Sequence, residues 1–195
     1  MKIKDLLFLI KSDLYNYEDK DDPKTFIKYM LFKKAFKFSF WFRCCNFLYK
    51  NNNKWLLLFA NIVYRRYQEK YCIDLSYKTE IGGGLCLYHF FATAIANDAQ
   101  IGKNAVISSN VTIGSKARGA YAGSPIIGDD VLLCPGSIVI GNIKIGNNVI
   151  VGGNSVVTKD VPDNAVVGGI PAKILSYDGA KGYIRDKSYE GINDE

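Results

Sequence analysis

The single histidine of this chain is the side chain best suited to proton transfer near neutral pH. An imidazole titrates close to neutrality, so His89 could take the proton of a hydroxyl group, which is a poor nucleophile on its own. Asp74 lies fifteen residues earlier. A carboxylate on the second ring nitrogen would fix the tautomer and stabilise the imidazolium. Alternatively, His89 is a structural histidine and Asp74 forms a turn. Which alternative holds depends on the elements that position the two residues.

The sequence around these residues repeats with a period of six. From Ile127 it reads IGDDVL, LCPGSI, VIGNIK, IGNNVI, VGGNSV and VTKDVP, and an aliphatic residue opens each hexad. The same frame runs upstream from Ile95, an earlier frame opens at Leu75, and Thr93 and Ala94 offset the two. A period of six fits neither a helix nor simple alternation. It predicts a parallel β-helix whose coils contain about eighteen residues, whereas a glycine-rich β-sandwich would require accidental spacing.

This architecture offers a way for Asp74 and His89 to meet. Fifteen residues is a little under one coil, so the two side chains could meet across adjacent rungs. His89 also lies beside the offset at Thr93 and Ala94, and such a distortion would move it off the regular face into a cleft. Residues 115–125, SKARGAYAGSP, interrupt the hexads and predict a projecting loop. Long loops on repeat scaffolds are usually functional.

The organisation predicted from these patterns has three parts. Residues 1–72 form a helical N-terminal domain, 73–175 form the β-helix, and 176–195 form a polar tail that is either mobile or packed on a neighbouring subunit. Apolar positions at helical spacing predict a helix over 3–17. Pro23 suits the first turn of the following segment, which mixes aromatics and lysines to about Arg43. NNNK at 51–54 predicts a turn, and a further helix is expected from Trp55 to Tyr71.

Charge is concentrated in the helical domain. Residues 1–73 hold 15 Lys and Arg against 7 Asp and Glu, whereas residues 74–195 hold 10 against 12. One interpretation is a cap that covers the open end of the β-helix and helps subunits to associate, since end rungs expose unpaired strand edges. The alternative is a basic, aromatic surface that contacts anionic lipid or a polyanionic glycan. Peripheral membrane contact could also be an added property of the cap.

Several classes of protein are disfavoured by composition. The five cysteines are odd in number and lack a CxxC spacing, which favours reduced thiols and argues against a zinc site. The N-terminus does not read as a signal peptide, and the longest apolar run, 55–64, is too short to span a bilayer. No sequence motif indicates nucleic-acid binding. The expected location is the cytoplasm, with the inner face of the membrane as an added possibility.

Residues 74–175 resemble the hexapeptide-repeat acyltransferases, and within them the serine O-acetyltransferase branch. The resemblance is carried by DLSYKTEIGGGLCLYH, VTIGSKARGAYAGSPIIGDDV and GNIKIGNNVIVGGNSVVTKDVPDNAVVGGIPAKI, the last of which ends in a typical closing signature. The short helical part is more similar to that of the polysaccharide-biosynthesis acetyltransferases of the colanic-acid and capsule type. The resemblance implies a mainly β fold, a left-handed parallel β-helix of hexapeptide repeats with a small α-helical domain.

The resemblance also implies site residues and partners. His89 would be the general base and Asp74 its support, and the acetyl thioester would be attacked directly, without an acyl-enzyme. The donor would be acetyl-CoA, bound in the groove between two subunits of a homotrimer, and trimers could pair into hexamers. No metal is expected. In that family, small residues lie beside the pantetheine arm, and lysines would face the CoA phosphates as point charges. The matching positions in this chain are Gly153, Thr158, Lys159 and Lys173.

The sequence departs from the serine enzymes at the acceptor side. They carry an aspartate just before the base, where this chain has Tyr88, and Arg-His before the proline of the loop, where it has Gly123 and Ser124. The loss of these residues removes ionic contacts to a zwitterion. Flat aromatic faces suit a sugar ring, although they could equally pack between subunits. The expected acceptor-site residues are Tyr88, Tyr121 and Ser124, with Phe90 and Phe91 as further aromatic faces.

Three functions follow from these observations. The first is transfer of acetyl from acetyl-CoA to a hydroxyl of a sugar or glycan precursor. The second is serine O-acetylation in cysteine synthesis, and the third is a non-catalytic scaffold, against which an intact Asp74 and His89 pair argues. A carbonic-anhydrase site of this fold needs three histidine ligands and is excluded by the single histidine. Pyrophosphorylase chemistry would need a nucleotidyl domain that the sequence lacks.

Overall fold

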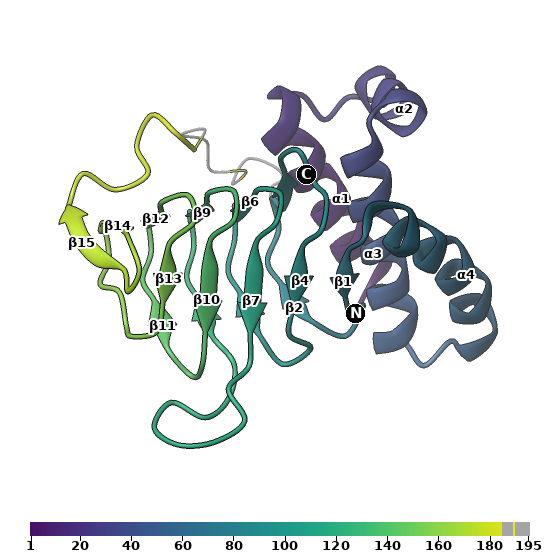
Figure 1. Cartoon of the computed structure of the whole chain (residues 1–195). Coiled ribbons are helices and arrows are strands. Elements are labelled where there is room, and N and C mark those ends of the chain that lie inside the picture. The colour runs from purple at the N-terminus through teal and green to yellow at the C-terminus, as the bar shows by residue number, and fades with distance from the viewer. Residues whose placement is uncertain (185–188, 190–195) are drawn as a thin grey trace.

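The computed structural model describes residues 1–184 and 189. Four helices at the N-terminus pack against one end of a stack of short strands (Figure 1). The helices are α1 (Ile3–Glu18), α2 (Pro23–Phe32), α3 (Lys34–Lys50) and α4 (Lys54–Tyr71). The strands are β1 (Asp74–Leu75), β2 (Glu80–Ile81), β3 (Cys86–Leu87), β4 (Ala94–Ile95), β5 (Gln100–Ile101), β6 (Val106–Ile107), β7 (Thr112–Gly114), β8 (Ile126–Ile127), β9 (Leu132–Leu133), β10 (Ile138–Ile140), β11 (Lys144–Ile145), β12 (Ile150–Val151), β13 (Val156–Val157), β14 (Val166–Gly168) and β15 (Lys173–Ser176).

The strands form three sheets, one on each side of the coil, so the chain is a parallel β-helix. The sheet orders are β1-β4-β7-β10-β13, β11-β8-β5-β2 and β15-β14-β12-β9-β6-β3. All pairings between these strands are parallel except that of β15 with β14, which is antiparallel and ends the stack. Register aligns the hexad openers of successive coils into rows that point inward. One such row consists of Leu75, Ile95, Ile113, Val139 and Val157, all buried.

The two-residue offset lies at the corner that carries His89. In the first coil Asp74 pairs with Ala94, twenty residues later, whereas Ala94 pairs with Thr112 after the expected eighteen. The extra residues lie between β3 and β4, because Leu87 ends one strand and Ala94 begins the next. The corner that follows β3 is therefore longer than the regular corners of the coil.

Corner residues of successive coils are linked by hydrogen bonds. The Asp129 side chain accepts from the Lys103 amide at 2.6 Å, Asn147 from the Asp129 amide at 2.8 Å, and Asp163 from the Asn147 amide at 2.7 Å. A Cβ on Gly128 would lie 2.5 Å from Asn147 Oδ1. The glycine of the repeated Ile-Gly pair therefore leaves room for the next coil's polar side chain.

The helical domain closes the first coil with an aromatic core and a buried ion pair. Phe38, Phe42 and Tyr64 belong to the same buried cluster as Leu75 and Leu87. Arg43 of α3 donates to both carboxylate oxygens of Asp13 on α1, at 2.9 and 2.8 Å, and also to the carbonyls of Ile81 and Gly82, each at 2.6 Å. Burial raises the pKa of the Asp13 carboxyl, while the guanidinium opposes that rise. Polar contacts thus fix how the helices sit on the coil.

The helical segment differs from the sequence expectation in the stretch after Pro23. The aromatic and lysine-rich stretch after Pro23 is two helices, because Lys33 leaves the helical region with φ −104° and ψ 104°. α3 then continues beyond Arg43 to Lys50. Lysine and aromatic residues on both sides of Lys33 gave no signal for this break. The break turns α3 onto the first coil and leaves Lys33 and Lys34 beside the corner that carries His89.

The predicted loop and tail are seen in part. Residues 115–125 stand out from the coil (Figure 1), and paired amide-to-carbonyl bonds between Lys116 and Gly123, each 2.9 Å, close them into a hairpin. Ala180 and Ile184 of the tail are buried beside Cys86, Val106 and Ile150 of their own chain. Tyr189 donates to Asp21 at 3.2 Å. The remaining tail positions, 185–188 and 190–195, lie outside the described residues.

Candidate active site

His89 occupies an irregular corner between β3 and β4. Its φ is +48°, and Ala92 at the same corner has φ +51°, a region that residues other than glycine rarely adopt. The corner is held by the Tyr88 amide bonded to Ile107 O at 2.9 Å and by the Ala92 amide bonded to Tyr71 O at 3.0 Å. The imidazole is exposed. Such conformations persist where surrounding contacts hold them, and they are often found at functional sites.

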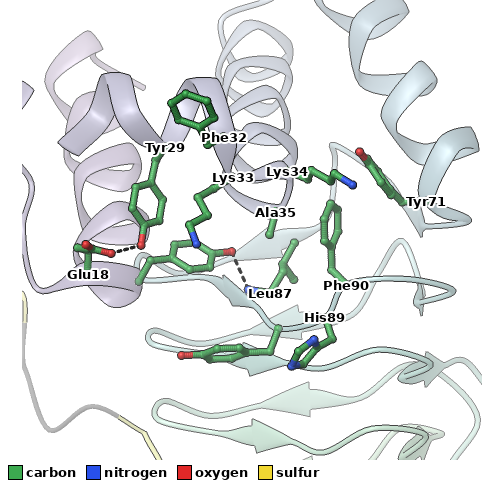
Figure 2. Close-up of a pocket in the computed structure, with 12 residues that line it drawn as sticks. Glu18, Tyr29, Phe32, Lys33, Lys34, Ala35, Tyr71, Leu87, His89 and Phe90 are labelled. Atoms are coloured by element: carbon green, nitrogen blue, oxygen red, sulfur yellow. Dashed lines mark hydrogen bonds between the residues drawn. The ribbon is translucent and has the colours of Figure 1, made fainter. Parts of the chain in front are cut away.

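A cavity of about 630 Å³ opens between this corner and the helical domain. Figure 2 shows its walls: α1, α2 and α3 supply one side, and Leu87, His89 and Phe90 supply the other. The Tyr88 ring lies beside the imidazole, with ring centroids 6.5 Å apart. The residues that face His89 across the cavity come from the helices and the end of α4: Tyr17, Glu18, Tyr29, Lys33, Lys34 and Tyr71.

Two tyrosines and one glutamate of the cavity are held in place by hydrogen bonds. The Leu87 amide donates to the hydroxyl of Tyr17 at 2.8 Å, and burial raises the pKa of Tyr17 well above its ordinary value, so the phenol stays neutral. Glu18 accepts from the Tyr29 hydroxyl and from Lys28 at 3.0 Å. Both hydrogen bonds lower the pKa of Glu18, and the bond from Tyr29 has the larger effect. Lys33 and Lys34 form no ion pair with any described residue.

Asp74 is placed apart from the His89 cavity. It is exposed at the start of β1 and lines a separate hollow of about 350 Å³ with Arg65, Gln68 and Glu69. Its amide donates to Thr93 O at 2.9 Å. Within residues 1–184 and 189, no hydrogen bond or ion pair joins Asp74 to His89. The role of Asp74 as partner of the base therefore stays a prediction.

The residues expected at the acceptor side divide into two groups. Tyr88 and Phe90 line the His89 cavity, and Phe90 packs against Tyr71 with ring centroids 4.8 Å apart and ring planes tilted by 42°. Tyr121 and Ser124 lie in the projecting loop and do not line that cavity. Tyr121 is exposed, whereas Ser124 is buried and donates its hydroxyl to Asp98 at 2.6 Å. In this single chain Ser124 therefore holds the base of the loop.

The residues expected to bind the cofactor lie near the other end of the stack. Gly153, Thr158, Lys159 and Lys173 are all exposed, in or beside β12, β13 and β15. Four strand spacings separate β1 from β13, which is about 19 Å at the usual 4.8 Å per strand. A long, extended ligand is needed to reach from these residues to the corner that carries His89. No three His, Cys, Asp or Glu side chains gather as a metal site among the described residues.

Sequence reasoning missed the contribution of the helices to the cavity. Tyr17, Glu18, Tyr29, Lys33 and Lys34 reach His89 only because α1 to α3 fold back onto the first coil. The basic and aromatic composition of this segment was the available signal, but it did not indicate which residues meet the corner. Among the helices that the structure describes, none has both the length and the apolar character needed to cross a membrane.

Comparisons with known proteins agree with this architecture. Residues 124–159 match the family model described as bacterial transferase hexapeptide (six repeats). The chain is a hexapeptide-repeat protein with serine acetyltransferases among its relatives. It is 32% identical to the mitochondrial serine acetyltransferase 3 of Arabidopsis thaliana over 88% of this chain and 43% of that protein. It is 38% identical to a serine acetyltransferase of Staphylococcus aureus over 56% of this chain and 51% of that protein.

A solved structure shows the same fold. The serine acetyltransferase of Neisseria gonorrhoeae superposes with a TM-score of 0.75 at 29% identity, covering 89% of this chain and 66% of that chain. A second structure of that enzyme, in complex with serine, gives a TM-score of 0.72 at 28% identity and covers 70% of that chain. The predicted left-handed β-helix with a small helical domain is confirmed. The expected closeness to polysaccharide acetyltransferases finds no support here, and this chain spans about half the length of the curated relatives reported.

Proposed function

We propose that this hexapeptide-repeat protein is an acetyl-CoA-dependent O-acetyltransferase in which His89 is the general base. The observation that carries the proposal is the exposed imidazole at a strained corner, facing a cavity large enough for a small acceptor. The base takes the acceptor's hydroxyl proton, and the resulting oxygen nucleophile attacks the acetyl thioester, which releases CoA as the thiol. Because a hydroxyl is a weak nucleophile at neutral pH, this proton transfer is where the protein supplies most help.

Serine is the first acceptor to test. The relatives are serine acetyltransferases, and one solved relative is in complex with serine. Within the cavity, Lys33 and Lys34 offer cations to a carboxylate, and Glu18 offers an anion to an ammonium group. Glu18 already accepts bonds from Lys28 and Tyr29, which weakens its attraction for a second cation.

A sugar hydroxyl is the second candidate acceptor, and the aromatic side of the cavity favours it. Tyr88 is 44% exposed beside His89, and Phe91, at the same corner, is 50% exposed. Flat apolar faces next to a base suit the faces of a pyranose ring. Tyr88 also stands where the resemblance to the serine enzymes leads one to expect an aspartate, so an ionic contact to a zwitterion is absent at that position.

The donor is proposed to lie along the stack rather than across it. Thr158 and Lys159 follow β13, four strand spacings from the first coil, and the extended arm of acetyl-CoA suits that separation. Lys159 and Lys173 would contact its phosphates as mobile point charges. The homotrimer implied by the family resemblance would place the donor groove between two subunits, and light scattering on the purified protein measures the oligomeric state.

One assay tests the reaction and separates the acceptors. CoA release is followed with a thiol reagent in the presence of acetyl-CoA and either free serine, simple sugars or glycan fragments. Turnover with serine supports the first acceptor, and turnover with sugars alone supports the second. The replacement His89→Ala is expected to lower kcat by roughly 10²- to 10⁴-fold. Full activity of His89→Ala would contradict the proposal, and its far-ultraviolet circular dichroism should match that of the wild type because the side chain is exposed.

The contribution of Asp74 needs its own variant. If Asp74 orients the imidazole in the working assembly, Asp74→Asn should lower kcat and alter the pH profile of kcat/KM while KM for acetyl-CoA stays unchanged. If Asp74 is a corner residue only, the pH profile should match that of the wild type. Because Asp74 is exposed at the start of β1, the substitution should leave the fold intact, which a thermal melt verifies.

A further inference from the structure

A basic hollow lies between α3 and α4, next to the His89 cavity. It has a volume of about 240 Å³ and is lined by six residues, of which four are cations and none is acidic: Lys34, Lys37, Arg66, Tyr67, Lys70 and Tyr71. Because no acidic residue lines the hollow, α3 and α4 present a concentrated positive charge there. Such a hollow attracts an anion that carries more than one negative charge.

The cations of this hollow remain uncompensated. In the part of the chain that the structure describes, none of the four takes part in an ion pair. Lys34 and Lys70 lie on the ring of the same residue, Tyr71, at 6.0 and 5.8 Å from its centroid. Lys37 donates to the carbonyl of Leu31 at 2.8 Å, which holds its ammonium group in place. Like charges held together repel one another, and a bound anion would remove that repulsion.

We propose that the hollow between α3 and α4 is a binding site for the phosphate group of a phosphorylated ligand. An arginine and three lysines suit phosphate chemically, since the guanidinium offers a planar pair of donors and the ammonium groups act as point charges. The tyrosine rings of Tyr67 and Tyr71 supply apolar walls beside the cations. The binding step stands independently of acetyl transfer.

The site borders the candidate active site. Lys34 and Tyr71 line both the hollow and the His89 cavity, and Figure 2 shows the two side chains together at the end of that cavity away from Glu18. A ligand whose phosphate occupies the hollow can therefore extend a neighbouring hydroxyl toward His89. This use of the site, to position a phosphorylated acceptor, rests on the proposed function.

Two sources could supply the phosphate group, a free phosphate ester or a lipid headgroup. The apolar residues on α4 bear on this choice. Trp55, Phe59 and Ile62 are 80%, 66% and 47% exposed, and Arg66 and Lys70 continue the same helical face at spacings of four. An apolar stripe that leads into a cationic hollow matches the chemistry of an anionic lipid surface. The same cations would also bind a soluble phosphate ester.

Calorimetric titration with inorganic pyrophosphate tests the site in the full-length protein without acetyl-CoA. The double variant Arg66→Glu/Lys70→Glu is expected to bind pyrophosphate at least tenfold more weakly than the wild type. The control Lys103→Glu/Lys144→Glu makes the same charge change at two exposed positions on the β-helix and should bind like the wild type. Equal weakening in both variants, or no binding by the wild type, would overturn the proposal. The milder pair Arg66→Gln/Lys70→Gln repeats the test if the first variant folds poorly.

Sedimentation with vesicles separates the two sources. Vesicles of phosphatidylglycerol in phosphatidylcholine are compared with pure phosphatidylcholine, using the same three proteins. Binding to the anionic vesicles that is lost in Arg66→Glu/Lys70→Glu assigns a lipid headgroup, and pyrophosphate binding without vesicle binding assigns a free ester. His89→Ala should bind pyrophosphate as the wild type does. Failure of acetyl transfer would therefore leave this result standing, whereas failure of pyrophosphate binding would overturn the site without affecting the acetyl-transfer assay.

Discussion

The polar groups at helix ends and at coil corners find their partners at very different distances along the chain. Asp22, just before α2, accepts from the amides of Lys24 and Thr25, each at 3.0 Å. Asp163, at a corner of the β-helix, accepts from the amide of Asn147, sixteen residues earlier. A helix end is thus completed by its own sequence, whereas a coil corner is completed by the next coil. The β-helix depends on stacking in a way that the helices do not.

Between the helical domain and the β-helix, hydrogen bonds join residues that are still further apart in the sequence. Arg43 bonds to Asp13, thirty residues away, and to the carbonyls of Ile81 and Gly82, thirty-eight and thirty-nine residues away. The Leu85 amide donates to the same Asp13 carboxylate at 2.8 Å. One buried ion pair therefore joins α1, α3 and the first coil. It is also the structure that holds the helical wall of the cavity opposite His89.

The largest expected effect comes from breaking this ion pair. Arg43→Met leaves the buried Asp13 carboxylate without its cation, and such a loss typically costs about 3–5 kcal/mol of the free energy of unfolding. The helical domain should separate from the first coil before the β-helix unfolds, because the β-helix has its own row of buried aliphatic residues. Urea titration followed by tryptophan fluorescence, which reports on Trp41 and Trp55 of the helices, measures the first transition.

The double variant Arg43→Met/Asp13→Leu is the matched control. It removes both charges and should recover much of the lost stability, although the Leu85 amide then lacks its acceptor, at a cost of about 1–3 kcal/mol. If Arg43→Met alone changes the free energy of unfolding by less than the double variant does, the ion pair does not hold the two regions together.

A smaller effect is expected from filling the space between two coils. In Gly128→Ala the new Cβ would lie 2.5 Å from Asn147 Oδ1 and 2.8 Å from the carbonyl oxygen of Gly146. Backbone cannot move far between stacked coils, so the substitution should cost about 1–3 kcal/mol through overpacking. In Gly153→Ala the Cβ would meet Pro135 O at 3.4 Å and nothing closer. Thermal melts should therefore separate the two alanine variants, and equal melting temperatures would contradict this account of the repeated glycine.

The β-helix could be predicted because its information is local and repeated. Each hexad specifies one inward aliphatic residue and one corner, so the register of Ile95 with Ile113 and of Val139 with Val157 follows from the period. The left-handed φ of Asn104 and Asn148 at corners matches the residues that tolerate it. The offset at Thr93 and Ala94 also located the irregular corner correctly, since the two extra residues lie between β3 and β4.

The cavity could not be predicted to the same extent, because the contacts that join its walls follow no sequence repeat. Lys33 meets the corner at His89 across more than fifty residues, through a helix break that has no proline or glycine. The pairing of Asp74 with His89 was inferred from spacing, and in the single chain the two side chains line different hollows. Spacing fixes which coil a residue occupies, but the direction of a side chain at a corner depends on the local backbone.

The smallest expected effect concerns the end of a helix, and pH reveals it. Hydrogen bonds from the Thr25 hydroxyl and amide lower the pKa of Asp22 below its ordinary value of 3.8. A carboxylate whose folded pKa is lowered stabilises the fold fully above the unfolded pKa, and this stabilisation is lost as the pH falls through the folded pKa. Asp22→Ala should therefore lower the melting temperature at neutral pH, by less than Gly128→Ala does, and the difference from wild type should shrink in strong acid. A difference that stays constant at every pH would mean that the charge of Asp22 does not stabilise α2, and that its side chain acts only through hydrogen bonds that do not depend on ionisation.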